Sequence, residues 1–500
     1  MKYFFAVCLF LLNVFLISCS VSKKNYTPAK KYPQQLLRRD FALLREILEN
    51  KHPSLYWYMP KDSMDMYFDR YYQQIRDTMT EQQFAWQILA PLVDKIHCGH
   101  TSVSLSKAYA KWADGKRFPS FPLSFKVWND TMAVTGNLNR KDTVFKRGTI
   151  VTAINGIPGK TIVKRMFDYL PQDGYADNIN FIRVSANFPY YHRNIYGISK
   201  AYTITYKDSA GAEKTTTIPV YTPPKDTVKK ISHRTDTTGK AKRPVTKPVV
   251  KKLTEYRSMS IDSSHTLAIM TLNTFSKGRL RTFFRRSFRE IKRSNINNLV
   301  LDIRSNGGGK VAISTLLTKY ISRKPFKVAD TLYAVSKTLA PYTKYIKGRF
   351  LNNIELFFIS KKQKDGLYHL GHFEKKLYKP KKRNHYNGKV YVLVNGPTFS
   401  ASTLFCNAVK GQNGIKLLGE ETGGGWHGNN GIMIPDIILP ITKTRVRLPL
   451  FRLVQYNHVP KNGTGILPDV YIGTSYDALL KGYDKKMRVV KEMIYNGVSF

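Results

Sequence analysis

Apolar residues near the N-terminus recur at helical spacing, three or four positions apart. The first helix face is given by Leu37, Phe41, Leu44 and Leu48. This is the pattern of a helix with one buried side. The helix is expected to end at His52, because the residue before a proline disfavours the helical conformation. A second run of the same kind covers residues 84–92, so residues 33–115 are expected to form an N-terminal helical domain.

The hydrophobic period changes to two after residue 120. Residues 123–127 alternate apolar and polar side chains, which predicts a strand with one buried face. Further along, Asn155-Gly156 follows a short apolar run, and this pair is typical of a tight hairpin turn. Residues 162–170 then predict a helix. We therefore expect a β-rich domain over residues 116–220.

Strands and helices alternate in the C-terminal half. Apolar runs of strand length are followed by amphipathic runs of helix length, as in a sheet covered by helices. The predicted strands are 267–272, 298–304 and 389–394, and the predicted helices are 280–291, 312–320 and 403–409. We expect an α/β core over residues 258–476, with a Lys-rich insertion at 341–388 and a C-terminal helix at 477–500.

The first residues have the pattern of an export signal. Lys2 precedes an apolar run that is too short to span a membrane comfortably. The run ends in LISC at residues 16–19, which resembles the lipobox of bacterial lipoproteins. This resemblance implies a signal peptide over 1–18, a lipid on Cys19 and a polar tether over 19–32. The alternative is an ordinary secretory signal.

The residue after the expected lipidation site indicates which membrane would hold the protein. Ser20 stands there instead of Asp, and by the usual bacterial sorting pattern this favours the outer membrane. We therefore expect a lipid-anchored protein of the cell envelope that faces the periplasm. One diacylated cysteine together with a basic chain is adequate for stable anchoring.

The composition and net charge indicate which kinds of binding partner to expect. The 500 residues include 81 Lys and Arg against 34 Asp and Glu, a formal net charge of +47, which attracts anionic surfaces. The 42% hydrophobic content excludes a wholly disordered chain. Residues 221–257 are basic and of low complexity, and we expect a solvated linker there. A specific nucleic-acid interface is disfavoured, because this stretch lacks interleaved aromatic residues and any known motif.

A Gly-rich turn over residues 305–309 follows one of the predicted buried strands. It fails the phosphate-loop pattern, because Arg304 stands where the first glycine is required. Glycines also allow backbone N–H groups to approach a developing oxyanion. Ser400, between a buried strand and a helix, is the candidate nucleophile. Taken alone, a serine at this position is more often a helix N-cap.

Four segments, in this order and spacing, resemble the C-terminal processing (tail-specific) serine peptidases. They are LVLDIRSNGGG at 299–309, TFSAS at 398–402, GEETG at 419–423 and GILPD at 465–469. In addition, residues 146–156 and the helix after them resemble a PDZ domain, a module that adds extended peptides to a sheet edge. The alternative for that region is a generic β-rich domain. The family resemblance implies a crotonase-like (ClpP-like) α/β core and serine endopeptidase chemistry that needs no metal or cofactor.

The resemblance also implies roles for single residues. Ser400 takes the position of the nucleophile. The base of the best-known branch is a lysine, and Gly425 stands where it would fall. A second, tricorn-like branch uses the histidine of a GHT segment, which matches residues 99–101, so His100 is the expected general base. The expected oxyanion donors are Ala401 with Gly307 or Gly308, and the candidate supporting residues are Thr398, Glu420, Thr422 and Asn462.

Two supports of the histidine depart from that branch. Tricorn-like enzymes have a serine just before the histidine and a glutamate near the GxxPD segment, whereas this chain has Gly99 and Asn462. The expected function is hydrolysis of peptide bonds in envelope proteins or unfolded substrates. The alternative is a catalytically weak or inactive peptide-binding scaffold of the same fold. The oligomeric state is left open.

The histidine segment allows two further readings. His97, Cys98 and His100 are all metal-ligand types, but no matching carboxylate motif accompanies them. Cys98 and Cys406 stand close in sequence to the two proposed catalytic residues. They could form a disulfide in an oxidising compartment, or be two small buried side chains.

Overall fold

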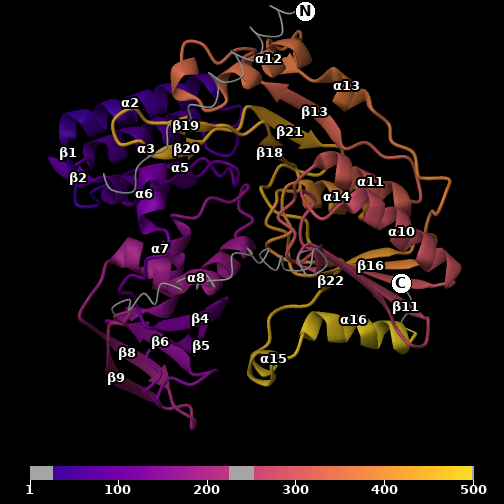
Figure 1. Cartoon of the computed structure of the whole chain (residues 1–500), viewed down its shortest axis with the longest axis horizontal. Helices are drawn as coiled ribbons and strands as arrows, with labels where there is room; N and C mark the ends of the chain where they lie inside the picture. Colours follow the sequence, from indigo (N-terminus) through magenta and orange to yellow (C-terminus); the bar gives the residue numbers. More distant parts are fainter. Residues whose placement is uncertain (1–25, 225–252, 498–500) are drawn as a thin grey trace, which may run out of the picture.

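The computed structural model describes residues 26–224 and 253–497. Figure 1 shows an N-terminal helical part, a β-rich part below it and a larger C-terminal α/β part beside both. The signal peptide, Cys19, half of the expected tether and most of the basic linker lie outside the described residues. None of the described helices is long and apolar enough to cross a membrane.

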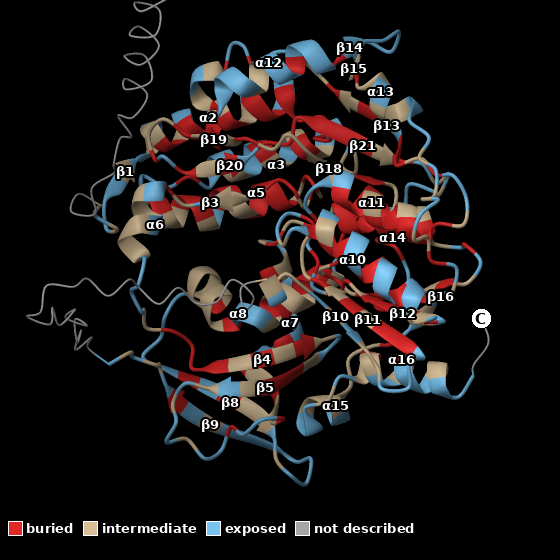
Figure 2. Ribbon diagram, turned by 45° about the vertical axis from the view of Figure 1, so that its right-hand side comes forward, coloured by how far each residue is buried: buried red, intermediate tan, exposed pale blue. Residues whose placement is uncertain are grey.

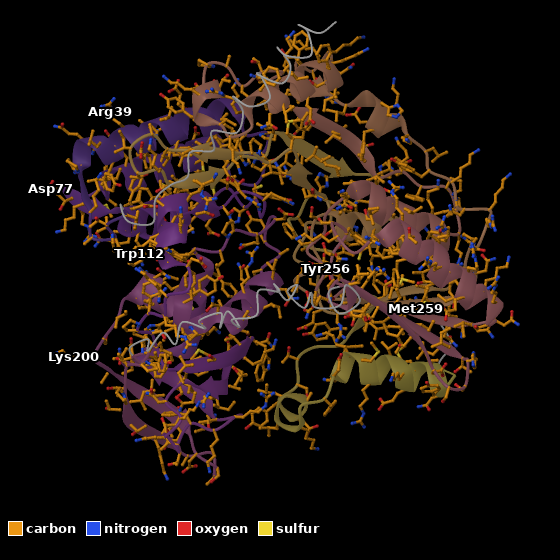
Figure 3. All side chains as sticks on the ribbon, viewed as in Figure 1. Arg39, Asp77, Trp112, Lys200, Tyr256 and Met259 are labelled. Atoms are coloured by element: carbon orange, nitrogen blue, oxygen red, sulfur yellow. The ribbon has the colours of Figure 1, made fainter. Side chains whose placement is uncertain are left out.

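The N-terminal part is helical, as its apolar spacing predicts. Its helices are α2 (Gln34–Lys51), α3 (Lys61–Gln73), α4 (Glu81–Gln83), the π-helical turn η2 (Phe84–Leu89), α5 (Ala90–Asp94) and α6 (Lys107–Ala113). The strands β1 (Lys31–Pro33) and β2 (Thr78–Thr80) pair antiparallel. The four apolar residues predicted for the first helix face are buried, and α2 ends at His52. Figure 3 labels Arg39 and Asp77 at the outer edge of this part.

The β-rich part is one antiparallel sheet with two helices. The strand order is β4-β5-β6-β8-β9, and β7 pairs with β6. The strands are β4 (Leu123–Trp128), β5 (Thr131–Asn137), β6 (Ile150–Ile154), β7 (Ile157–Pro158), β8 (Ala201–Lys207) and β9 (Glu213–Pro219), and the helices are α7 (Gly159–Phe167) and α8 (Asn178–Tyr196). Asn155 and Gly156 both have positive φ angles in the turn between β6 and β7, which is the hairpin turn that their sequence predicts.

The C-terminal part is built on a six-stranded sheet of order β10-β11-β12-β16-β17-β22, in which only β10 is antiparallel to its neighbour. The strands are β10 (Arg257–Ile261), β11 (Leu267–Leu272), β12 (Asn298–Asp302), β16 (Lys389–Val394), β17 (Ile415–Gly419) and β22 (Val470–Tyr471). One face packs against α10 (Leu280–Arg293), α11 (Val311–Ile321) and α14 (Ala401–Val409), and the other against α16 (Lys485–Tyr495). The predicted α/β core is confirmed.

The segment 341–388, which was expected as a Lys-rich insertion in the core, has secondary structure of its own. It contains η3 (Thr343–Tyr345), α12 (Arg349–Ile359), β14 (Lys361–Lys362), β15 (Tyr368–His369) and α13 (Gly371–Lys375). Its strands extend a second sheet of order β14-β15-β13-β21-β18, with β13 at Ala329–Ala334, β18 at Gly428–Ile432 and β21 at Phe451–Gln455. The many lysines of the segment concealed these short strands, because charged residues are weak strand formers.

A three-stranded sheet joins the N-terminal part to a distant segment of the C-terminal part. β3 (Val103–Ser104) of the N-terminal part pairs with β20 (Arg445–Arg447), which pairs with β19 (Asp436–Ile438). One buried cluster contains side chains from both α2 and β21, and both elements have red, buried stretches in the upper half of Figure 2. The N-terminal helices and the C-terminal part therefore share a hydrophobic core.

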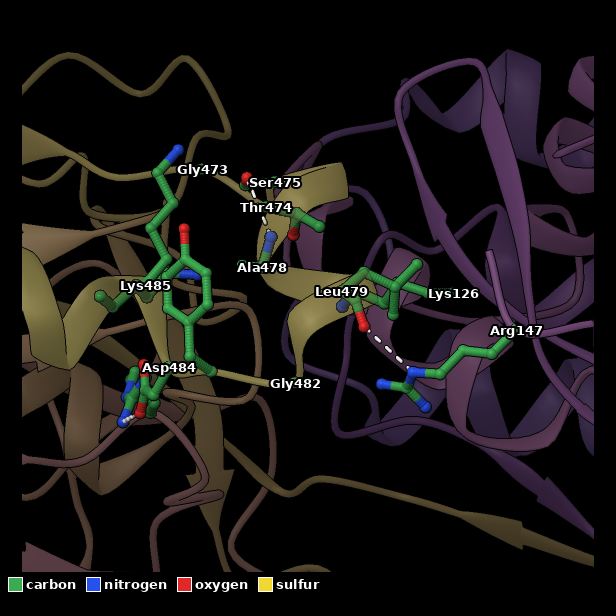
Figure 4. A pocket seen from close by; sticks show the side chains of 13 residues that line it. Lys126, Arg147, Gly473, Thr474, Ser475, Ala478, Leu479, Gly482, Asp484 and Lys485 are labelled. Atoms are coloured by element: carbon green, nitrogen blue, oxygen red, sulfur yellow. Dashed lines mark hydrogen bonds and ion pairs between the residues drawn. The ribbon is translucent and has the colours of Figure 1, made fainter. Parts of the chain in front are cut away.

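The expected C-terminal helix is two helices. Gly482 has a left-handed conformation between α15 (Tyr476–Lys481) and α16, because a glycine without Cβ adopts this geometry readily at a helix end. α15 contacts the β-rich part, where the Arg147 side chain donates to the Leu479 carbonyl oxygen (3.0 Å) and the Tyr476 hydroxyl to that of Gly148 (3.0 Å). An open pocket of about 430 Å³ lies at this junction (Figure 4).

Candidate active site

Ser400 stands on a sharp turn between β16 and α14. Its backbone has φ 58° and ψ −122°, a conformation that costs a non-glycine residue roughly 1–3 kcal/mol and is typical of functional sites. Thr398 holds the turn: its hydroxyl donates to the Ile303 carbonyl oxygen (3.0 Å) and accepts from the Asn395 N–H (3.1 Å). Ser400 is only partly buried, so its hydroxyl is presented by a rigid turn at an accessible position.

The Gly-rich turn after β12 lies directly against the serine turn. The Phe399 N–H donates to the Asn306 carbonyl oxygen (3.2 Å). Gly308 has φ 93°, and a Cβ there would stand 2.8 Å from the Cβ of Ser400. Only glycine therefore allows this approach.

The two glycine candidates for the oxyanion hole differ in their hydrogen bonds. The Gly308 N–H donates to the Asn306 side-chain oxygen (3.0 Å) and is therefore occupied. The N–H groups of Gly307 and Ala401 donate to no group in the described part of the chain, and Gly307 is exposed. Gly307 and Ala401 are thus the amides available to a developing oxyanion, and Gly308 provides space.

His100 comes from the N-terminal part and meets Ser400 across β18. A Cβ placed on Gly431 would stand 2.8 Å from the Ser400 Oγ and 3.1 Å from the His100 Nε2, so both atoms face the same small space. No direct hydrogen bond joins these two described side chains. The His100 ring is buried and lies with its centroid 4.7 Å from that of Phe399.

The far side of His100 faces a carboxylate that the sequence motifs do not reveal. Asp173 Oδ1 lies 3.8 Å from the His100 Nδ1. The same carboxylate accepts from the N–H groups of Gly99 (2.8 Å) and Gly425 (3.4 Å). Asp173 is buried in the loop between α7 and α8. Its only sequence signal is an acidic residue in a Pro-Gln-Asp-Gly turn.

Asn462 does not take the position expected for it. It is exposed, and its side-chain oxygen accepts from the N–H (3.1 Å) and hydroxyl (2.8 Å) of Thr464, in its own loop. The negative charge beside His100 comes from Asp173 instead. The GxxPD segment still contributes indirectly, because the Gly463 carbonyl oxygen accepts from the N–H of Tyr175, two residues beyond Asp173 (2.8 Å).

Gly99 and Phe399 fit each other. A Cβ on Gly99 would stand 2.7 Å from the Phe399 ring. Gly99 is the position where the tricorn-like pattern considered from the sequence has a serine. The large ring fills the space that a side chain before the histidine would need.

Two further candidate residues hold the loops around the site. Glu420 forms a buried ion pair with Lys486 of α16. The Thr422 hydroxyl donates to the Gly424 carbonyl oxygen (3.0 Å) and accepts from the Ile466 N–H (2.8 Å). These contacts connect the GEETG segment to α16 and to the GILPD segment.

Residues 266–472 match the model of peptidase family S41. This stretch of the chain is similar to the S41 peptidases. Two solved structures are similar in fold across nearly the whole chain. Mature CPAF has a TM-score of 0.61 at 14% identity, and a serine-to-alanine mutant of CPAF has 0.62 at 13%. Each comparison covers 93% of this chain and 99% of the other. No curated protein sequence matches the chain.

The stretch that matches the S41 model supplies only part of the candidate site. Ser400, Gly307 and Ala401 lie within the matched residues, whereas His100 and Asp173 lie outside them. At such low identity the structural likeness to CPAF shows the fold alone. The assignment of His100 and Asp173 therefore depends on the geometry described above.

Cys98 and Cys406 are free thiols, so the disulfide considered from the sequence is not formed. Their side chains belong to different hydrophobic clusters, Cys98 with the N-terminal helices and Cys406 with α14 on the large sheet. Burial raises the pKa of Cys98 to about 12 and also raises that of Cys406. Both behave as small buried apolar residues.

Proposed function

We propose that the protein is a serine endopeptidase that cleaves peptide bonds by acyl transfer, with Ser400 as nucleophile and His100 as general base. One observation carries this proposal: the Ser400 Oγ and His100 Nε2 face the same point beside Gly431, from a strained turn and a buried ring. A substrate that fills this space can bring the hydroxyl and imidazole into hydrogen-bonding distance, since such contacts often tighten only in the complex.

The proposed reaction has two stages. The Ser400 Oγ attacks the scissile carbonyl carbon while the His100 Nε2 takes the hydroxyl proton, and the N–H groups of Gly307 and Ala401 stabilise the oxyanion. His100 then donates the proton to the leaving amine. A water molecule, deprotonated by His100, hydrolyses the acyl-enzyme and releases Ser400.

Asp173 is the proposed positioning residue for His100. Its carboxylate favours the imidazolium that forms when the proton is transferred, and its bond from the Gly99 N–H fixes the neighbouring backbone. No lysine base is needed in this arrangement, which agrees with a glycine at position 425.

A catalytically weak or inactive peptide-binding scaffold is the second candidate. The observation in its favour is that the His100 Nδ1 is buried and has no hydrogen-bond acceptor among the described groups. The carboxylate at 3.8 Å is within ion-pair range but beyond a hydrogen bond.

The first test is labelling by a fluorophosphonate probe together with cleavage of unfolded casein, read by mass spectrometry. The wild type should be labelled at Ser400 and should cleave, and Ser400→Ala and His100→Ala should not cleave. Ser402→Ala is the matched control, because its hydroxyl lies in the same segment but is buried, and it should retain activity. Cleavage by Ser400→Ala would refute the mechanism. Peptide binding without labelling or cleavage would favour the scaffold.

We further propose that the chain is anchored through a lipid on Cys19 in the outer membrane and faces the periplasm. Support comes from the LISC segment and from the net charge of +47, which attracts anionic headgroups. Metabolic labelling with a fatty acid should modify the wild type but not Cys19→Ala. Equal labelling of both would refute this anchor.

A further inference from the structure

A cavity of about 530 Å³ lies where the N-terminal helices, the small three-stranded sheet and α8 meet. This volume is in the range of ligand-binding sites. The cavity extends to Gly99, the residue next to His100. Its aromatic walls are formed by Trp86, Tyr109, Tyr169, Tyr190 and Tyr191.

The lining of this cavity is basic. The described residues that line it include Arg183, Arg445 and Arg447 and no acidic side chain. Among the described residues, Arg183 donates to the Pro171 carbonyl oxygen (2.7 Å) and the Asn180 side-chain oxygen (3.0 Å), and its burial lowers its pKa. Neither Arg183 nor the exposed Arg447 forms an ion pair in the described part of the chain, whereas Arg445 lies 3.6 Å from Asp436.

The cavity is also bordered by a free strand edge. β3 is the outer strand of its sheet. The Arg447 N–H donates to the Ser102 carbonyl oxygen (2.9 Å), and alternate residues of an antiparallel strand face opposite sides. Val103, which lines the cavity, therefore directs its N–H and C=O away from β20. Residues 101 and 102 alone separate this edge from His100.

The strand edge that a PDZ-like domain would use is already occupied in part. On β4, the outer strand of the β-rich sheet, the Val127 N–H donates to the Ser185 hydroxyl of α8 (2.8 Å), and this hydroxyl lies 3.4 Å from the Val127 carbonyl oxygen. The chain's own helix thus satisfies the middle of that edge. A peptide that paired with β4 would have to displace this contact.

We infer that this cavity, the β3 groove, binds an acidic segment of the substrate as an extended strand along β3. Backbone bonds to Val103 would fix the register, and carboxylate side chains would meet Arg183 and Arg447. A strand advances about 3.3 Å per residue, so a peptide bound beside Val103 is directed toward His100 and Ser400. The inference rests on the proposed peptidase function and specifies its substrate class.

The test uses the full mature chain with Ser400→Ala, so that substrate is bound but not cut. Two fluorescein-labelled peptides of equal length and aromatic content are compared by anisotropy, one with glutamates and one with lysines at alternate positions. We expect at least roughly tenfold tighter binding of the glutamate peptide, with a marked loss between 50 mM and 300 mM salt. Equal binding of the two peptides would overturn the inference.

Two pairs of variants separate charge from strand pairing. Arg447→Glu should weaken binding of the glutamate peptide roughly fivefold, while Arg39→Glu, at the exposed outer edge in Figure 3, should not. Val103→Pro removes the outward N–H and should weaken binding about tenfold. Thr217→Pro is its control on β9, another edge strand, and should have no effect. Loss of binding equal in test and control variants would also overturn the inference.

Fluorophosphonate labelling of Ser400 in a parallel set with the native serine distinguishes the two hypotheses. If the probe labels Ser400 but the charge and proline variants bind the glutamate peptide as tightly as the parent, the β3 groove is rejected as the peptide site and the peptidase proposal stands. Selective binding at the groove without any labelling or cleavage rejects the peptidase and retains the groove as a peptide site. Melting temperatures within about 2 °C of the parent verify that each variant is folded.

Discussion

Replacing Asp173 with asparagine tests the support of His100 with little steric change. The asparagine side chain is almost the same size and retains an oxygen that can accept the Gly99 N–H, which now donates to Asp173 Oδ1. What is removed is the negative charge 3.8 Å from the His100 Nδ1. We expect kcat to fall while KM changes little, because the lost interaction strengthens only when the imidazolium forms.

The magnitude follows from the distance. Opposite unit charges at 3.8 Å attract by about 1 kcal/mol in water and by about 4 kcal/mol at an effective dielectric constant of about 20. Both side chains are largely excluded from solvent, at 7% and 4% relative exposure, so the larger value is the appropriate one. A loss of about 4 kcal/mol corresponds to a decrease of roughly 10³-fold in kcat.

The assay is steady-state hydrolysis of a quenched fluorescent peptide identified from the casein cleavage sites. Asp168→Asn is the control: it makes the same chemical change on a more exposed side chain that pairs with Lys95. It should leave kcat unchanged. A kcat of Asp173→Asn within twofold of the wild type, with an unchanged melting temperature, would refute the role assigned to this carboxylate.

Three further predictions concern the packing around the site. Gly99→Ser should lower activity at least roughly tenfold, because its Cβ would meet the Phe399 ring, and adding Phe399→Ala should restore most of it in the same peptide assay; no rescue would contradict the proposed fit. Gly308→Ala should reduce kcat by 10² or more, roughly, and lower the melting temperature, because of its φ of 93° and the collision with the serine turn; near-normal kinetics would count against this geometry. Cys98 and Cys406 are buried free thiols, so an alkylating reagent should modify neither in the native protein and both after unfolding without a reductant, as read by intact mass. If both react only after a reductant is added, they form a disulfide and this prediction is wrong.

The serine turn and the Gly-rich turn could be predicted because local sequence determines them. An apolar strand followed by Asn-Gly-Pro-Thr leads into the turn at Ser400, and three glycines after β12 allow close backbone approach. The α/β core could be predicted for the same reason, because its buried strands are continuous apolar runs in the sequence. The likeness of these segments to known motifs gave the residue roles.

The acid beside His100 could not be predicted in this way. Asp173 reaches the histidine only when the loop between α7 and α8 docks on the N-terminal part, and no periodicity or motif specifies that contact. The sequence pattern directed attention to Asn462, which lies exposed on its own loop. Similarly, β3 and β15 are two residues long, so their pairing depends on distant strands and not on their own composition.

The pairing of β3 with β20 has a consequence for the order in which the site is made. His100 stands just before β3, while β20 lies near the end of residues 266–472, the stretch that matches the S41 model. Contacts between such distant segments form late in folding, because the intervening chain must first lose much of its freedom. If Ser400 and His100 act together as proposed, a chain that has not yet paired β3 with β20 carries the nucleophile without a positioned base. If the protein is also exported as proposed, this order of folding would delay proteolysis until β20 has been released.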